Sequence, residues 1–356
     1  MRRTLIAVAL VAAALASSLV HAQGQGQIPG LWLPNASPTA KVSQTLGVTA
    51  IDLVYHRPAV NERDVWGALV PYGQVWRTGA NENTTIAFST DVTVEGEPLP
   101  AGVYGLHTLP AEGEWEVIFS HDTTAWGSFS YNEENDALRV KVQPQAAEHQ
   151  ERMQFAFDEV GADSAVLALS WAALRVPISI GVDLQATTLA SIREQLKGLS
   201  QFSWQGWAQA ANWCNQNEVN LEEAVQWADR SIGVEDRFEN QSAKSQLLAK
   251  LGDEEGSKAA MDLALGKANA GQLHNYGRQL IGQDQKQEAL AVFKRNAEQN
   301  PEAWFIGVGL ARGYSAVGDF ANAAKGMEDA IGKAPAGQEA YLGGLLTRLK
   351  NGEDIN

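Results

Sequence analysis

The residues best suited to binding chemistry lie in one short segment, residues 73–88, with the sequence GQVWRTGANENTTIAF. Arg77 and Thr78 stand before a glycine in this segment, and Asn81 and Asn83 follow it. A guanidinium beside amides and free backbone N–H groups can hold a carboxylate, a phosphate or the hydroxyls of a sugar. Asparagine and glycine are also ordinary turn residues. The sequence therefore leaves two interpretations open, a ligand-binding loop or a structural turn.

The geometry of a strand predicts where the side chains around Arg77 lie. Trp76 and Arg77 are adjacent, so on a strand their side chains would face opposite sides. We expect Trp76 in the core and Arg77 outside it or facing a concavity. Gly79 permits a left-handed backbone. We favour a structural role for Arg77, paired with an internal carboxylate such as Asp136, and a ligand contact for Asn81, whose loop position is easier to expose.

Aromatic side chains offer a second kind of ligand contact. Aromatic faces beside arginine and asparagine suit the C–H surface of a carbohydrate, but tryptophan is equally a common core residue. Trp66 and Trp126 each precede a glycine, which is typical of loops, and are predicted to be the better-exposed candidates. At least three of the five tryptophans of the first half are expected in the core: Trp66, Trp76, Trp115, Trp126 and Trp171.

No catalytic constellation stands out, and no catalytic residue, metal or other cofactor is predicted. Residues 132–136 (NEEND) are better explained as a solvated turn than as a catalytic carboxylate pair, and no nucleophile elbow is present. The single cysteine, Cys214, is predicted to be a buried structural thiol. Four histidines lack the spacing typical of metal ligands: His56, His107, His121 and His149.

Charge and the N-terminal residues indicate where the protein works. The net charge of −15 and a pI near 4.9 argue against nucleic acid as a partner. The chain opens MRRTLIAVALVAAALASSLVHAQ, in which two arginines precede an apolar run and Ala22 completes a small-x-small cleavage site. We expect a signal peptide over residues 1–22, a flexible leader over residues 23–36 and a periplasmic or secreted protein. A membrane anchor needs a longer apolar run, and no later segment is apolar enough to span a bilayer.

The chain has two halves with different hydrophobic periods. Residues 37–185 contain short alternating segments such as TAIDLVY, TTIAFST and EWEVIFS, which predict an antiparallel β-sandwich or jelly-roll. Residues 190–350 have a helical period, and a short linker is expected near residues 184–191. Small residues recur in the helical half at intervals of 35, 30 and 34: Ala224, Ala259, Ala289 and Ala323. Gly252, Gly282 and Gly318 are expected to mark turns between paired helices.

Both halves resemble known families. The first half resembles the bacterial domain of unknown function 2911 family through residues 65–81 (VWGALVPYGQVWRTGAN), residues 99–106 (LPAGVYGL), Arg57-Pro58, Trp126-Gly127, residues 136–139 (DALR) and Trp171. That resemblance implies an exported β-domain, sometimes joined to helical repeats, without an established activity. Arg57 is added to the candidate ligand contacts on this ground. Residues 203–335 resemble tetratricopeptide repeats, and the 30-residue interval suggests one trimmed helix pair.

These observations lead to one preferred function and one alternative. We expect an exported, non-enzymatic binding or adaptor protein, whose β-domain binds a small polar or glycan ligand and whose helical repeats bind a protein or peptide. The alternative is an enzyme that processes envelope glycans or small molecules at a site in the β-domain. The candidate ligand contacts are Arg57, Trp66, Arg77, Thr78, Asn81, Asn83 and Trp126.

Overall fold

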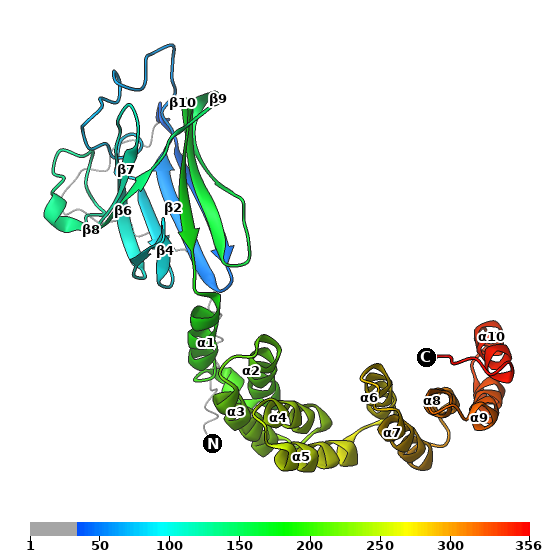
Figure 1. Ribbon diagram of the computed structural model, residues 1–356. Helices are drawn as coiled ribbons and strands as arrows, with labels where there is room; N and C mark the ends of the chain where they lie inside the picture. Colours follow the sequence, from blue (N-terminus) through cyan, green and yellow to red (C-terminus); the bar gives the residue numbers. More distant parts are fainter. Residues whose placement is uncertain (1–33) are drawn as a thin grey trace, which may run out of the picture. The chain divides into compact units, whose positions relative to one another are not determined.

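The computed structural model describes residues 34–356, which divide into two compact units between Val182 and Asp183 (Figure 1). The predicted signal peptide and residues 23–33 of the predicted leader lie outside the described residues. Within residues 34–356, no helix combines the length and the apolar character that a membrane crossing requires. An all-β unit followed by an all-α unit confirms the predicted fold class.

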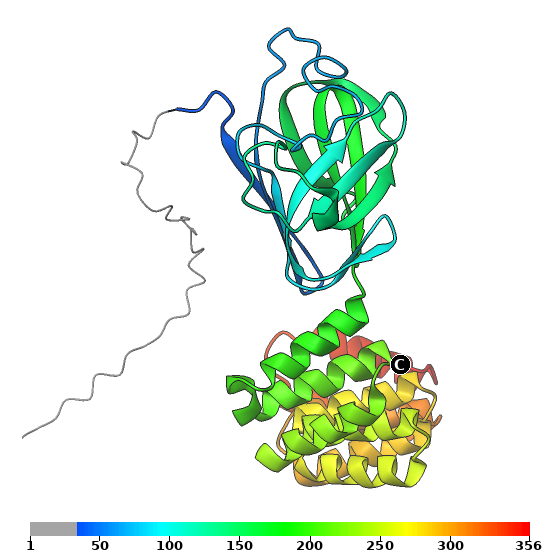
Figure 2. The ribbon, with the colours of Figure 1, turned by 90° about the vertical axis from the view of Figure 1, so that its left-hand side faces the viewer.

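The first unit is a sandwich of two antiparallel sheets, seen as two layers of strands in Figure 2. In residues 34–182 one sheet has six strands in the order β1-β2-β3-β6-β7-β8, and the other has four in the order β5-β4-β10-β9. The strands are β1 (Thr39–Leu46), β2 (Thr49–His56), β3 (Thr85–Phe88), β4 (Val92–Val94), β5 (Glu97–Leu99), β6 (Gly102–Leu109), β7 (Trp115–Ser120), β8 (Asp136–Val142), β9 (Gln145–Asp158) and β10 (Ser164–Gly181).

Buried and exposed side chains alternate along the strands, and the buried ones form the core between the two sheets. Ile51, Leu53 and Tyr55 of β2 are buried, while the residues between them are more exposed. The hydroxyl of Tyr55 also accepts a hydrogen bond from the backbone N–H of Phe155 on β9, 3.0 Å away, which ties the two sheets together. The alternation of apolar and polar residues in the sequence therefore corresponds to the alternation of buried and exposed side chains in the sandwich.

The second unit consists of ten α-helices arranged as successive pairs (Figure 1). Helix α1 comes first, α2 to α9 form four hairpins of adjacent helices, and α10 packs against α9. The helices are α1 (Leu184–Gln195), α2 (Trp204–Asn217), α3 (Leu221–Val234), α4 (Phe238–Lys250), α5 (Glu254–Lys267), α6 (Ala270–Gly282), α7 (Lys286–Gln299), α8 (Phe305–Ala316), α9 (Phe320–Lys333) and α10 (Glu339–Lys350). This succession of helix pairs is the tetratricopeptide-like arrangement that the sequence predicts.

The repeat is more regular than the sequence suggests. The second helices of the four pairs, α3, α5, α7 and α9, begin at intervals of 33, 32 and 34 residues. Ala224, Ala289 and Ala323 are each the fourth residue of their helix and are fully buried. The fourth residue of α5 is Ser257, whereas Ala259 is exposed. Aligning on Ala259 was therefore wrong by two residues, and no pair is trimmed.

Two other details of the helical half differ from the prediction. The expected linker at residues 184–191 is the start of α1, because the Asp183 carboxylate accepts a hydrogen bond from the Ala186 N–H at 2.9 Å and caps the helix. Gly252 and Gly318 do adopt the left-handed backbone of a turn. Gly282, however, ends α6, and Asp284 supplies the left-handed residue with a φ of 61°.

Candidate functional site

The outer face of the six-stranded sheet carries the largest group of polar candidates. His107 on β6, Ile118 on β7 and Arg139 on β8 are direct neighbours across the strands. They alternate with core residues, so they lie on the face that points away from the second sheet. His107 and Ile118 are nevertheless at most 1% exposed, because residues 121–135 cross over this face. We refer to residues 121–135 as the covering loop.

Arg77 joins this face through an isolated bridge between strands. Trp76 and Thr108 of β6 exchange backbone hydrogen bonds of 2.8 and 2.9 Å, in antiparallel register. The indole of Trp76 packs against the core, within 5.8 Å of the rings of Trp66 and Trp171. Arg77 consequently lies on the opposite side, with its guanidinium carbon 5.8 Å from the ring centre of Trp126. The predicted placement of both residues is confirmed.

The guanidinium of Arg77 has no acidic partner among residues 34–356. It forms no ion pair there, and its Nε is buried without a hydrogen-bond acceptor. Burial lowers the pKa of Arg77 from its ordinary value, because removing a charge from water disfavours the charged form. The expected pairing with Asp136 is wrong. The Asp136 carboxylate instead accepts hydrogen bonds from Tyr131 at 2.7 Å and Arg139 at 3.0 Å.

Two exposed aromatic rings lie beside Arg77 on the covering loop. Trp126 is 61% exposed and Phe129 is 85% exposed. Their rings are nearly parallel, with an angle of 15° and centroids 6.1 Å apart. Gly127 between them has a φ of 75°, a backbone conformation that favours glycine. We call Trp126 and Phe129 the aromatic platform, and its exposure agrees with the prediction for Trp126.

A second arginine on the same face is fully engaged. The Arg139 guanidinium donates to Glu116 at 2.6 Å, to Asp136 at 3.0 Å and to the Tyr131 hydroxyl at 2.7 Å. Burial acts to lower the pKa of Arg139, but the bonds to Glu116 and Asp136 outweigh it and raise the pKa. Burial, followed by the bond to Asp136, raises the pKa of Tyr131 to about 12. This network was not predicted, although the spacing of Asp136 and Arg139 at the start of one strand was a signal for it.

His107 is enclosed beneath the same loop. Its Nδ1 lies 3.2 Å from the Ser128 hydroxyl, and its ring centre is 5.3 Å from that of Tyr131. Burial lowers the pKa of His107 to about 4, against the opposite effect of the Asp136 and Asp122 carboxylates. The imidazole is therefore neutral near pH 7 and is not reachable from solvent, which makes it a structural group in this arrangement.

Thr78 is a structural residue of the segment that contains Arg77. It is 1% exposed, has a left-handed φ of 53°, and donates to the carbonyl of Trp76 and the hydroxyl of Thr108, both at 3.2 Å. Gly79 does not adopt the left-handed backbone that a glycine permits. It is required for another reason, because a Cβ at this position would lie 2.8 Å from the hydroxyl of Thr84.

The two asparagines hold neighbouring parts of the chain. Asn81 has a left-handed φ of 55°, is half-buried, and donates its amide to the carbonyl of Ser37 at 3.3 Å. Asn83 is 7% exposed and donates to the carbonyl of Asp122 at 3.3 Å, while its backbone N–H donates to Ala125 at 3.0 Å. The contacts of Asn83 tie the segment to the covering loop, and the contact with Ser37 leaves Asn81 less available to a ligand than expected.

Trp66 and Arg57 are directed elsewhere. Trp66 is not exposed as expected: its ring packs edge-to-face against Trp115 at 4.8 Å and Trp171 at 5.6 Å. The loop turns back through a bridge between Trp66 and Val70, which directs the indole into the core. Arg57 donates through its Nε to the carbonyl of Met153 on β9 at 2.8 Å and so links the two sheets. Of the predicted contacts, Arg77 and Trp126 are the pair that meets at an exposed surface.

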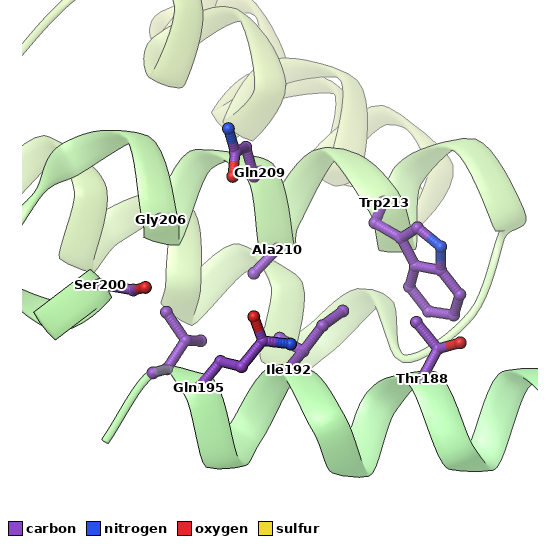
Figure 3. A pocket seen from close by; sticks show the side chains of 9 residues that line it. Thr188, Ile192, Gln195, Ser200, Gly206, Gln209, Ala210 and Trp213 are labelled. Atoms are coloured by element: carbon purple, nitrogen blue, oxygen red, sulfur yellow. The ribbon is translucent and has the colours of Figure 1, made fainter. Parts of the chain in front are cut away.

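The helical unit contains a separate cavity between α1 and α2, with a volume of about 240 Å³. Figure 3 shows Ile192 and Gln195 of α1 facing Ala210 and Trp213 of α2 across the cavity. Its lining contains no charged side chain, and the sequence analysis did not predict it. Leu199 and Phe202, in the short helical turn that contributes Ser200, are 87% and 74% exposed. The lining residues are Thr188, Ile192, Gln195, Leu196, Ser200, Gly206, Gln209, Ala210 and Trp213.

Two other titratable groups in the helical unit are structural. Cys214 is buried, as predicted, and burial raises the pKa of its thiol to about 11, which leaves it unreactive near neutral pH. His274 packs edge-to-face against Phe293 and Phe305, and burial lowers its pKa to about 4. Across residues 34–356 no cluster of three or more histidine, cysteine or acidic residues is arranged to hold a metal ion.

One family model matches the first unit. The family model described as "Protein of unknown function (DUF2911)" matches residues 37–180. The match spans the β-sandwich unit, which we call the DUF2911 domain below. The match covers all ten strands of the DUF2911 domain except the last residue of β10, and it confirms the resemblance seen in residues 65–81 and 99–106.

The helical protein YrrB is among the solved structures that are similar to this chain. YrrB, described as a TPR protein with an unusual peptide-binding site, is 16% identical, and the match covers 45% of this chain and 84% of that one with a TM-score of 0.29. The tetratricopeptide-like character of the helical unit rests on its own helix pairs. No curated protein is similar enough to this chain to count as a match.

Proposed function

We propose that this protein is an exported, non-enzymatic binding or adaptor protein. In this proposal the DUF2911 domain holds a small polar ligand, such as part of a glycan, and the helical unit binds a protein or peptide. One observation carries the first half: the exposed aromatic platform lies beside Arg77, whose charge has no acidic partner in residues 34–356. The platform and Arg77 together are called the Arg77–Trp126 site below.

The physical state of this site supports ligand binding. An aromatic side chain can bury about 150–250 Å² when it is covered, so exposed Trp126 and Phe129 leave a large apolar area in water. The Nε of Arg77 is also buried without an acceptor and lacks the hydrogen bond that it would make in water. A sugar could cover the exposed aromatic rings with its C–H face, and its oxygens could accept hydrogen bonds from Arg77.

The cavity between α1 and α2 supports the second half of the proposal. Its volume of about 240 Å³ lies just below the ~300–1,000 Å³ typical of small-molecule sites. That size suits one large apolar side chain of a partner. Gln195 and Gln209 at the cavity carry amides that can hydrogen-bond the backbone next to such a side chain.

The alternative of a glycan- or small-molecule-processing enzyme has weaker support. Glu82, which is paired with Trp126 in an isolated bridge, lies with its carboxylate 3.3 Å from the imidazole of His56. Four further titratable groups lie on the face that the covering loop crosses: His107, Tyr131, Asp136 and Arg139. They bond to one another or to Ser128 beneath the covering loop, and His107 is 1% exposed. Catalysis at this site would require acid and base groups that reach the ligand.

Export is proposed from the N-terminal sequence alone. Cleavage after Ala22 would leave a mature chain that begins with Gln23. N-terminal sequencing of the protein recovered from the periplasm or medium tests this. A chain that retains residues 1–22 in the cytoplasm would overturn the proposal of export.

Binding can be tested on the full-length protein by calorimetric titration with neutral and acidic oligosaccharides. We expect Trp126→Ala to weaken glycan binding, since it removes half of the platform. Phe202→Ala is the matched control, because Phe202 is a similarly exposed aromatic residue of the helical unit, 74% exposed. Equal affinities of wild type and Trp126→Ala would remove the platform from this role, and the release of new products during titration would favour the enzyme.

A further inference from the structure

Arg77 differs from the other arginines of the DUF2911 domain. Residues 34–182 contain six arginines, and five of them have identified polar partners. Two form ion pairs, Arg139 with Glu116 and Asp136, and Arg175 with Asp158. Three donate to backbone carbonyls: Arg57 to Met153, Arg63 to Val60, and Arg152 to Ala36. Within that described range, only Arg77 has neither an ion pair nor a hydrogen-bond acceptor.

Arg77 is also held in place. The backbone of Trp76 is paired with β6, and Arg77 lies beneath the ring of Trp126. The covering loop is fixed close to the sheet at Gly105, where a Cβ would collide with the carbonyl of Asp122 and the amide of Asn83. The backbone that carries Arg77 therefore needs no reordering when a ligand binds, which favours ligand binding at this site.

From this geometry we propose that the ligand of the DUF2911 domain carries a carboxylate on a sugar ring, with the carboxylate bound by Arg77 and the ring stacked on Trp126. The inference rests on the proposed binding function of the Arg77–Trp126 site. A guanidinium holds a carboxylate through two parallel N–H···O bonds. Because Arg77 and Trp126 are only 5.8 Å apart, the charged group and the stacked surface must belong to the same or adjacent rings of the ligand.

Charge balance favours a carboxylate over a phosphate. One guanidinium neutralises the single charge of a carboxylate, whereas a phosphate monoester carries about −1.5 to −2 near pH 7. The surplus would be repelled by a chain whose net charge is −15. Two sources share the favoured chemistry, a uronic acid with the carboxylate on the ring and a lactyl ether such as that of N-acetylmuramic acid.

Two matched pairs of probes distinguish these sources and isolate the charge. The first pair is trigalacturonate and its methyl ester. The second pair is the N-acetylglucosamine–N-acetylmuramic acid disaccharide and N,N′-diacetylchitobiose, which lacks the lactyl carboxylate. Titrated into the full-length protein, one carboxylated probe should bind about tenfold or more tighter than its neutral partner, the effect of one charge-assisted contact.

Variants then assign the effect to Arg77. Arg77→Gln should remove the preference for the carboxylated probe while binding of the neutral probe persists. Arg152→Gln is the matched control, since it also removes one positive charge but lies on β9 of the other sheet. If Arg77→Gln does not fold, wild type still supplies a test, because raising the ionic strength should weaken binding of the carboxylated probe and spare the neutral one.

The outcomes separate this inference from the proposed function. Equal binding of charged and neutral probes, with loss of both in Trp126→Ala, would overturn the carboxylate and keep the binding site. Tighter binding of a sugar phosphate such as glucose 6-phosphate would overturn the ligand class. Failure of all these probes to bind would count against both the inference and the proposed function.

Discussion

Two arginines on one face of the DUF2911 domain should respond to the same substitution in opposite ways. Arg139→Met removes the partner of Asp136, whose side chain is 11% exposed, and of Glu116, whose side chain is 30% exposed. Arg77→Met removes a guanidinium that has no acidic partner in residues 34–356. We expect Arg139→Met to destabilise the domain strongly and Arg77→Met to change its stability little.

The expected magnitude follows from the contacts. Breaking a buried ion pair from one side costs about 3–5 kcal/mol, because the remaining charge is stranded. Arg139 is itself 27% exposed, so water compensates in part and we expect about 2–3 kcal/mol. For a domain of this size that loss lowers the melting midpoint by about 4–12 °C. Arg77→Met loses a contact with Trp126 worth about 0.5–1 kcal/mol. Relief of a desolvated charge, the cause of its lowered pKa, offsets that loss.

Differential scanning calorimetry of the full-length protein measures both effects. Circular dichroism at 222 nm, recorded in parallel, follows the helical unit and identifies which transition belongs to the sandwich. A midpoint unchanged by Arg139→Met, together with a fall of several degrees for Arg77→Met, would mean that Arg77 has the structural role. That result would refute the reasoning that leaves Arg77 available to a ligand.

Three further predictions concern other parts of the chain. The folded pKa of His107, about 4, lies below the ordinary value of 6.5, so stability is complete above pH 6.5 and falls as the pH drops toward 4, by about 2 kcal/mol at pH 5. Urea denaturation of the wild type and of His107→Gln at pH 7 and pH 5 measures this effect. The part of the stability loss at pH 5 that comes from His107 should be absent in the variant. Gly105→Ala should push Asp122, and with it the covering loop, away from β6 and weaken glycan binding about tenfold in calorimetric titration, and unchanged affinity would contradict the fixed position of the loop. Phe293→Ala should cost the helical unit about 3–5 kcal/mol, since the ring is 1% exposed. Its midpoint at 222 nm should fall while the sandwich transition stays in place.

Much of the fold could be predicted because it depends on local periodicity. Alternation in segments such as TAIDLVYH defines which side of a strand enters the core, and β2 has that burial pattern. The recurrence of small residues identifies helix pairs, even though Ala259 led to an error of two residues in the register. Adjacent residues on a strand face opposite ways, so the positions of Trp76 and Arg77 followed from their order alone.

The candidate site could be predicted only in part. The arginine and the exposed tryptophan were both named in advance, but neither their 5.8 Å separation nor the contribution of Phe129 was. Trp66 was expected outside and packs inside, since a loop tryptophan can turn either way and the bridge to Val70 decides. The cavity between α1 and α2 went unnoticed because the segment that forms α1 had been taken for a linker.

The sequence by itself determined the two units, their strand and helix content and the side of the strand on which Arg77 lies, because these depend on neighbours a few residues apart. Only the tertiary structure decided which carboxylate each arginine meets. Asp136 bonds to Arg139 and Tyr131, and Glu116 joins them through the register of β7 and β8. Ion pairing depends on distances between atoms that are far apart in sequence. The packing of these strands and of the covering loop therefore left Arg77 without an acidic partner in residues 34–356.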